Sequence, residues 1–298
     1  MRLVLATRRS LLALAQSRAF GRELAARSPG LVIDELQVVT TGDKVTNVPL
    51  AEVGGKGLFT KEIEEALARS EADFAVHSFK DVPADLASTF VIACVPRRVD
   101  ARDVLVTRSG AKLLELPVGA KVGTSSLRRG LQLSLVRPDL VVAPLRGNVD
   151  TRLRKLEQGE LDAIVLARAG LERLGLAARI TETIDADRVI PAPGQGALAI
   201  ECRAADFATR EILSILSDSE SEIAVACERG VMKTVGGNCN VPFGAHAVRR
   251  DGELHLLAFL AAADGKNPRR IERKVPWPGT VEEAATWGRE AGRLLLEG

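Results

Sequence analysis

The sequence predicts an α/β protein with two similar α/β domains and a small α+β domain at the C-terminal end. Short apolar runs alternate with amphipathic helical patterns along most of the chain, which is typical of β-α-β units. Two stretches are also repeated: LATRRSLLALAQS near the start is similar to VGTSSLRRGLQLS at 122–134, and EADFAVHS at 71–78 is similar to ELDAIVLA at 160–167. From about residue 221 this alternation ends, which favours a separate, smaller domain.

The spacing of apolar residues predicts the helices and strands of the first domain. Thr60 stands directly before an amphipathic run, where an N-cap is expected. The expected elements are a strand at 3–6, a helix at 11–27, a strand at 31–39, a helix at 61–69 and a strand entered at 73–76. A strand at 197–202 and a helix at 206–217 follow Pro191.

The second stretch repeats this alternation. Asn148 stands where it can cap the second of two helices. The expected elements are a strand near Val122, a helix from about Leu127, a strand at 141–143, a helix at 149–158 and a strand at 162–166. The C-terminal part is expected to contain a strand at 253–260, a turn at 264–268 and a helix at 281–296.

Composition excludes several classes of function. The 298 residues include 41 Lys and Arg against 39 Asp and Glu, so a net charge of +2 gives no field that would select nucleic acid. Aromatic residues make up 3% of the chain and Tyr is absent, so stacking platforms for single strands are scarce. No apolar run reaches the ~20 residues of a membrane helix, and the start lacks the long apolar core of an export signal. We therefore expect a cytoplasmic protein that binds neither membranes nor nucleic acid.

Four cysteines are spread without the spacing of a metal site. Cys94, Cys202 and Cys227 lie in apolar strand or helix segments and are expected to be core residues in a reducing compartment. Cys239 differs, because it lies in the Gly- and Asn-rich segment GGNCNVPFG, where a thiol is accessible to act as a nucleophile or covalent anchor. No metal is expected, and His246 and His255 are interpreted as ordinary strand residues.

Basic residues recur where predicted strands turn into helices. A helix N-terminus attracts anions, and Arg binds carboxylate or phosphate in a bidentate way. Three such turns predict a ligand with several negative groups, whereas any one of them alone could be a solvated, salt-bridged surface. The residues are Arg8 and Ser10 at the first turn, Thr124, Ser126, Arg128 and Arg129 at the second, and Arg146 with Arg152 at the third.

Two further segments are candidates for the site. The segment GGKGLF at 54–59 lacks P-loop spacing, and it is either a cover bringing Lys56 and Phe59 over a ligand or a plain flexible turn. The segment HSFKDVP follows a buried strand, where ligands lie in α/β domains. Asp81, beside Lys80, could hold an N–H donor or stabilise a developing cation; the alternative is a turn-forming Asp.

The motifs resemble those of one family over nearly the whole chain. The chain is similar to the hydroxymethylbilane synthases, also called porphobilinogen deaminases, in ATRRSLLALAQS, GGKGLFTKEIE, DFAVHSFKDVP, GTSSLRRGLQL, LRGNVDTRL, PAPGQGALAIECR and CNVPFGA. The resemblance implies a stepwise condensation of four porphobilinogen molecules into the linear tetrapyrrole hydroxymethylbilane, with release of ammonia. The alternative is a non-catalytic receptor for a small anionic solute, but that function expects an export signal and has no need of Cys239.

The resemblance also implies roles for individual residues. Asp81 would be the catalytic carboxylate, and a dipyrromethane cofactor would be attached through Cys239. Arg173 joins the candidates, and Lys56 and Phe59 match a mobile loop. Cofactor binding is implied for Lys80, Asp81, Ser126, Arg128, Arg129, Arg146 and Cys239, and substrate binding for Arg8, Ser10, Lys56, Phe59, Thr124, Arg146, Arg152 and Arg173.

The same resemblance implies the domain organisation. Two domains of the periplasmic-binding-protein type would span 1–98 with 197–217 and 99–196, and the α+β domain carrying Cys239 would span 218–298. A monomer is expected. Two departures from the family's pattern are Asn238, where many members have Gly, and Glu52, where some have Lys.

Overall fold

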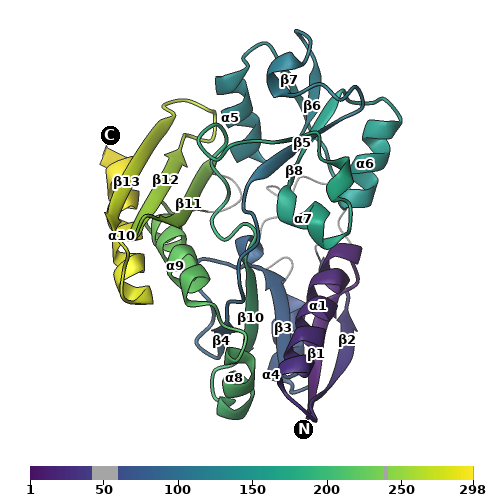
Figure 1. Cartoon of the computed structure of the whole chain (residues 1–298), viewed down its shortest axis with the longest axis vertical. Coiled ribbons are helices and arrows are strands. Elements are labelled where there is room, and N and C mark those ends of the chain that lie inside the picture. The colour runs from purple at the N-terminus through teal and green to yellow at the C-terminus, as the bar shows by residue number, and fades with distance from the viewer. Residues whose placement is uncertain (42–59, 238–240, 298) are drawn as a thin grey trace. The chain divides into compact units, whose positions relative to one another are not determined.

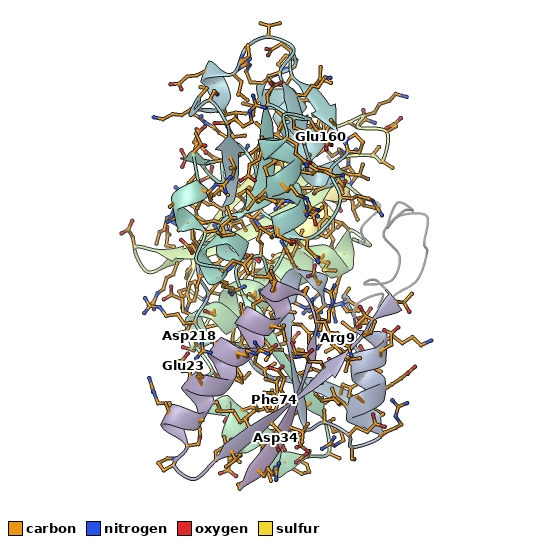
Figure 2. The ribbon with its side chains drawn as sticks, turned by 90° about the vertical axis from the view of Figure 1, so that its right-hand side faces the viewer. Arg9, Glu23, Asp34, Phe74, Glu160 and Asp218 are labelled. Carbon is orange, nitrogen blue, oxygen red and sulfur yellow. The ribbon has the colours of Figure 1, made fainter. Side chains whose placement is uncertain are left out.

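A computed structural model describes residues 1–41, 60–237 and 241–297. The chain divides into two compact units, one formed by 1–98 with 197–222 and the other by 99–196 with 223–298. Figures 1 and 2 show both units, which are described separately below.

The first unit contains a five-stranded sheet with the order β2-β1-β3-β10-β4. β1 pairs in parallel with β2 and β3, whereas β10 is antiparallel to both β3 and β4. The strands are β1 (Arg2–Arg8), β2 (Val32–Val38), β3 (Phe74–Ser78), β4 (Phe90–Cys94) and β10 (Leu198–Arg203), and the helices are α1 (Leu11–Arg27), α4 (Lys61–Ala68), the 3₁₀ turn η1 (Phe79–Asp81) and α8 (Phe207–Ser214).

Side chains alternate between the two faces of this sheet, as strand geometry requires. Leu5 and Phe74 pack with Phe20 of α1 on one face, while Ala6 and Ala75 pack with α4 on the other. Figure 2 shows Phe74 over the sheet, with Arg9 near the carboxyl end of β1, away from Asp34. Burial on both faces explains why β3 reads as a continuous apolar run.

The second unit contains a sheet with the order β7-β6-β8-β5-β9. β6 pairs in parallel with β7 and β8, and β5 is antiparallel to β8 and β9. Helix α5 covers one face, and α6 and α7 cover the other. The strands are β5 (Asp103–Thr107), β6 (Lys121–Gly123), β7 (Val141–Ala143), β8 (Ala163–Ala167) and β9 (Glu182–Thr183); the helices are η2 (Leu113–Glu115), α5 (Leu127–Val136), α6 (Val149–Glu157), α7 (Arg168–Arg173) and η3 (Ala177–Arg179).

The two five-stranded sheets have the same strand order and the same pattern of directions. In each, the first strand of the repeat lies between the second and the third, and an antiparallel strand separates the third from the edge. That antiparallel strand, β10 or β5, is reached only after the chain has passed through the other stretch. The two similar α/β folds predicted from the sequence repeats are therefore confirmed.

The C-terminal part forms a three-stranded antiparallel meander, β11 (Phe243–Arg250), β12 (Glu253–Leu260) and β13 (Arg269–Pro276), in that order. Helices α9 (Ser219–Thr234) and α10 (Val281–Glu297) contribute to the apolar core beside it. A Cβ atom at Gly288 of α10 would lie 1.9 Å from the Cys227 carbonyl oxygen, so glycine permits this close helix approach. The predicted α+β part is confirmed, while the predicted domain boundaries stay a prediction.

The structure corrects several local expectations. The sequence patterns do not predict strands β4, β5, β9 and β13. Strands β11 and β12 contain His246 and His255, which confirms the interpretation of both as strand residues. Thr60 and Asn148 precede α4 and α6 as expected, but neither side chain makes a capping hydrogen bond. Thr60 has helical backbone angles, and N-capping requires the extended conformation.

Candidate active site

Four candidate residues of the first unit lie at the carboxyl ends of two neighbouring strands. Arg8 ends β1, and Ser10 caps α1 with its Oγ accepting from the Ala13 N–H at 3.3 Å. Lys80 and Asp81 lie in η1, directly after β3. Because β1 and β3 are parallel neighbours, these turns meet at one edge of the sheet, and Asp81 is exposed there.

A buried amide joins these two turns. Gln16 of α1 donates from Nε2 to Ser78 Oγ at 3.0 Å, at the end of β3. Next to it, Ser17 Oγ donates to Thr7 Oγ1 at 2.8 Å. These bonds tie the start of α1 to the ends of β1 and β3, so the segments that carry Ser10 and Asp81 are held by one framework. Neither Gln16 nor Ser78 is predicted from the sequence as a functional residue. The adjacent polar residues Gln16 and Ser17 within the apolar run of α1 are a signal that could have found Gln16, whereas Ser78 is recognised only by its contact.

An acid–base pair lies beneath the same edge. His77 Nε2 is 2.9 Å from Glu201 Oε2, and the two side chains are almost fully buried. His77 belongs to β3 and Glu201 to the adjacent β10. This contact ties β3 to β10 just before Ser78 and Asp81, while the other oxygen of Glu201, Oε1, is buried without a hydrogen-bond partner among the described residues.

In the second unit, the turns after β6 and β7 are bonded to each other. Ser126 caps α5, with Oγ accepting from the Arg129 N–H at 3.4 Å. The Thr124 N–H donates to the Ala143 carbonyl at 2.9 Å. Ser125 Oγ donates to the Leu145 carbonyl and accepts from the Leu145 N–H. The two basic turns predicted from the sequence therefore form one structural edge.

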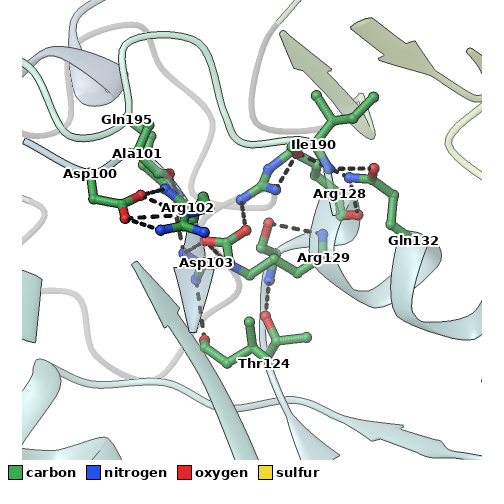
Figure 3. A network of polar contacts seen from close by, with 12 residues as sticks. Asp100, Ala101, Arg102, Asp103, Thr124, Arg128, Arg129, Gln132, Ile190 and Gln195 are labelled. Atoms are coloured by element: carbon green, nitrogen blue, oxygen red, sulfur yellow. Dashed lines mark hydrogen bonds and ion pairs between the residues drawn. The ribbon is translucent and has the colours of Figure 1, made fainter. Parts of the chain in front are cut away.

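Arg128 and Arg129 share a buried carboxylate that the sequence analysis did not identify. Arg129 donates from Nε and Nη2 to Asp103 Oδ1 at 3.1 and 2.7 Å, and Arg128 Nη2 is 2.8 Å from Asp103 Oδ2 (Figure 3). Burial raises the pKa of Asp103, but the charges of Arg128 and Arg129 outweigh burial and hold that pKa well below its usual range. One carboxylate thus fixes two guanidinium groups and neutralises one of them.

The segment after β9 completes this network. Gln195 Nε2 donates to Asp103 Oδ1 at 2.8 Å and to the Ala101 carbonyl at 2.6 Å. Arg128 Nη1 donates to the Ile190 carbonyl at 2.6 Å, while Arg129 Nη1 donates to the Val165 carbonyl at 3.3 Å. Both guanidinium groups are therefore held by backbone carbonyls as well as by Asp103.

Three further candidate arginines come from α6, α7 and the turn after β7. Arg152 Nε donates to the Gly147 carbonyl at 2.8 Å, and Arg173 Nη2 donates to the Gly196 carbonyl at 2.7 Å. Burial, and then the charges of Arg129 and Arg146, lower the pKa of Arg152 to about 10. Burial also lowers the pKa of Arg173 to about 10. Glu172 offsets part of this effect for Arg173, and a bound anion would further favour the charged form of both guanidinium groups.

This arrangement suits an anionic ligand. Arg128 and Arg129 share one carboxylate, and the charges of Arg129, Arg146 and Arg152 disfavour one another. Guanidinium groups with this spacing can bind several carboxylates at once. The structure brings Thr124, Ser126 and these arginines to the ends of β6, β7 and β8, in agreement with the sequence-based placement.

Some candidates lie outside the described residues. These are Lys56, Phe59 and Cys239, together with the departures Glu52 and Asn238. The other three cysteines are buried and free; burial raises the pKa of the Cys94 and Cys227 thiols to about 12 and that of Cys202 to about 11. Their thiols are therefore protonated at neutral pH and unsuited to act as nucleophiles.

Within residues 1–41, 60–237 and 241–297, no group of three or more His, Cys, Asp or Glu side chains has the arrangement of a metal site. Over the same residues, none of the helices is long and apolar enough to span a membrane.

Family models match both parts of the chain. "Porphobilinogen deaminase, dipyromethane cofactor binding domain" matches residues 3–211, and "Porphobilinogen deaminase, C-terminal domain" matches residues 222–297. A porphobilinogen deaminase of Sorangium cellulosum is 57% identical over 99% of both chains. Another, from Syntrophobacter fumaroxidans, is 49% identical over 98% of this chain and 93% of its own.

Two of the solved structures that are similar to this chain are more distant. The second substrate-binding domain of Lactococcus lactis GlnP is 11% identical, with a TM-score of 0.45 over 72% of this chain and 87% of its own. The VFT2 domain of Bordetella pertussis BvgS is 16% identical, with a TM-score of 0.43 over 71% and 84%. Likeness at this level carries no conclusion about function. The two family models and the 57% identity over almost the full length show that this chain belongs to the porphobilinogen deaminase family.

Proposed function

We propose that the chain is a hydroxymethylbilane synthase, a transferase that condenses four porphobilinogen molecules into a linear tetrapyrrole and releases ammonia at each addition. Its family membership and the arginines at the ends of β6, β7 and β8 support this function. The observation that carries the proposal is the pair of buried guanidinium groups of Arg128 and Arg129, which Asp103 holds where β6 turns into α5, beside the basic turn after β7.

The substrate matches this set of charges. Each porphobilinogen carries an acetate and a propionate group, so a chain of pyrroles presents carboxylates in pairs. Paired guanidinium groups can accept them in a bidentate way, with Arg128 and Arg129 already oriented by Asp103. We propose that these two bind cofactor carboxylates together with Lys80, Ser126 and Arg146, and that Arg8, Ser10, Thr124, Arg146, Arg152 and Arg173 bind the substrate.

We propose that Cys239 anchors a dipyrromethane cofactor. When bound, this group would supply a pyrrole carbon that accepts the first substrate unit. Cys239 is the remaining candidate after Cys94, Cys202 and Cys227, whose buried thiols have raised pKa values. The cation-rich ends of β6–β8 fit the carboxylates of such a group.

Asp81 is the proposed catalytic carboxylate. Its exposed side chain lies in η1, at the end of a buried strand and on a framework held by Gln16 and His77. Each addition breaks the C–N bond of an aminomethyl group, which leaves positive charge on the methylene-pyrrole. A fixed carboxylate can accept the pyrrole N–H and stabilise that charge. Lys56 and Phe59 are proposed to cover the substrate.

The remaining properties are proposed on the family resemblance and on composition. We propose that the protein is a cytoplasmic monomer that uses no metal and binds no nucleic acid. We also propose three domains: the first spans 1–98 together with 197–217, the second spans 99–196, and the third spans 218–298. A non-catalytic receptor is not favoured, because the family models and the curated relatives named above are porphobilinogen deaminases.

Intact-mass measurement of the purified protein tests this function. We expect the wild-type chain to exceed its sequence mass by two linked pyrrole units, and Cys239→Ser to have the bare mass. Cys202→Ser is the matched control and should retain the added mass, because its thiol is buried. An active wild-type enzyme with the bare mass would contradict the attachment, and a wild type that does not consume porphobilinogen would contradict the function.

A further inference from the structure

The segment IPAPGQ at 190–195 has no direct role in the function proposed above, yet it forms a buried connection inside the second unit. We define residues 190–195 as the strap. All of its residues except Ala192 are buried, although it is neither helix nor strand. A buried irregular segment must find hydrogen-bond partners elsewhere, so the partners show what the strap holds together.

On one side, the strap contacts α5 and the arginine pair. Gln132 Oε1 accepts from the Ile190 N–H at 2.8 Å, and Gln132 Nε2 donates to the Ile190 carbonyl at 3.2 Å. The same carbonyl accepts from Arg128 Nη1, and Gln195 at the other end of the strap donates to Asp103 (Figure 3). Gln132 therefore fixes the peptide group against which Arg128 rests.

On the other side, the strap contacts the C-terminal sheet. The Ala245 N–H of β11 donates to the Pro191 carbonyl at 3.0 Å, and the Ile190 side chain packs with Phe259 of β12. The fully buried carboxylate of Glu228 accepts from the Gly194 N–H at 2.7 Å and from the Ala247 N–H at 2.8 Å. These contacts fasten the strap to α9 and β11 at two places.

The strap is also stiff. Pro191 and Pro193 fix their own φ angles and so restrict the strap, while Gly194 permits the turn after them with φ of +71°. β11 is the strand that follows Cys239 in the sequence. Because the strap is stiff and is bonded on one side to α5 and on the other to β11, a shift of β11 would also shift the arginine pair of α5.

We propose that the strap sets the position of Arg128 and Arg129 relative to the sheet that follows Cys239, and that Gln132 is the positioning residue that holds it. The inference rests on the proposed function, in which these arginines bind the carboxylates of a group anchored at Cys239. Gln132 touches neither reacting atoms nor ligand in this role; it acts through Ile190 and Arg128.

The test compares Gln132→Met with wild type in the purified full chain. Methionine retains the length of the side chain but loses both bonds to Ile190. The Gln132 amide also donates to the Arg128 carbonyl at 3.3 Å, so the change removes three hydrogen bonds. We expect KM for porphobilinogen to rise about three- to tenfold and kcat to change less than about twofold. The fraction of chains carrying the added mass should fall as well. Ser134→Ala on the same helix is the matched control, because Ser134 Oγ donates to the Gly130 carbonyl within α5, and it should leave both values unchanged.

A second variant approaches the strap from β11. A Cβ atom at Gly244 would lie 2.8 Å from the Ile190 carbonyl oxygen and 2.9 Å from that of Pro191, so Gly244→Ala must displace the strap while Gln132 stays intact. We expect the same rise in KM, and this variant decides the matter if Gln132→Met does not fold. A lowered Tm with unchanged KM and cofactor load would overturn the positioning role. If the wild type itself carries no added mass, the proposed function fails and this inference falls with it.

Discussion

The two five-stranded sheets share one topology but present different chemistry at their strand ends. In the sheet of β1–β4 and β10, the edge carries the exposed carboxylate of Asp81, with Lys80 beside it and Arg8 at the end of the neighbouring strand β1. In the sheet of β5–β9, the corresponding edge carries several arginines and hides its carboxylate, Asp103, beneath two of them. The shared sheet topology fixes where the loops meet. Burial decides whether a carboxylate at that edge can contact a ligand, as the exposed Asp81 can, or pairs with neighbouring side chains, as the buried Asp103 does.

The first prediction separates the two carboxylates by their effect on turnover. Asp81→Ala should lower kcat about a thousandfold, because it removes the charge that stabilises the developing cation. The exposed position of Asp81 predicts an unchanged Tm. Steady-state kinetics measures kcat, and thermal denaturation measures Tm. Asp85→Ala on the same segment is the control and should retain turnover within a few-fold. Near-normal turnover of Asp81→Ala would remove it from the catalytic role.

The second prediction concerns the buried carboxylate and stability. Asp103→Asn leaves two buried guanidinium groups without their counterion, so we expect a loss of about 3–5 kcal/mol in the free energy of unfolding at pH 7. Because the pKa of Asp103 is lower in the folded than in the unfolded chain, its contribution is present at neutral pH and is lost as pH falls below about 4.

Denaturant titrations at several pH values measure this contribution. The difference between wild type and Asp103→Asn should narrow on acidification. Asp100→Asn is the control, because Asp100 pairs with Arg102 at a more exposed position and should matter less. A difference that does not depend on pH would show that Asp103 acts through packing alone.

The third prediction concerns a cation with a depressed pKa. The charged form of Arg152 is less favourable in the folded chain at every pH below about 10, so Arg152→Gln should raise the Tm of the cofactor-free Cys239→Ser protein by about 1–2 °C. In the loaded enzyme the same change should raise KM about tenfold, because a carboxylate partner is lost. Arg154→Gln, an exposed neighbour on α6, should do neither. A lower Tm for Arg152→Gln would refute the repulsion.

Local pattern was sufficient to predict most of the parallel strands and their helices. The strand at 73–76 and the helix from 127 follow from the periodic spacing of apolar residues, and the strand-to-helix turns rich in arginine are recognisable from their composition. Strand β5 is not predicted although residues 104–106 form an apolar run, and nothing local shows that it pairs antiparallel with β8 and β9. Gln16 and Gln132 escaped prediction for a related reason: a buried amide on a helix is recognised by what it contacts, and those contacts are distant in sequence.

The sequence by itself determined that this chain has two repeated α/β folds, a different C-terminal part and arginines at strand-to-helix turns, because periodicity and capping chemistry act over a few residues. Its motifs also indicated the family. Only the tertiary structure decided that Arg128 and Arg129 share Asp103 and that the strap connects them to β11, because such pairings depend on which distant segments are buried together. Burial strengthens electrostatic interactions and penalises unpaired groups, and burial is a property of the fold rather than of any local segment.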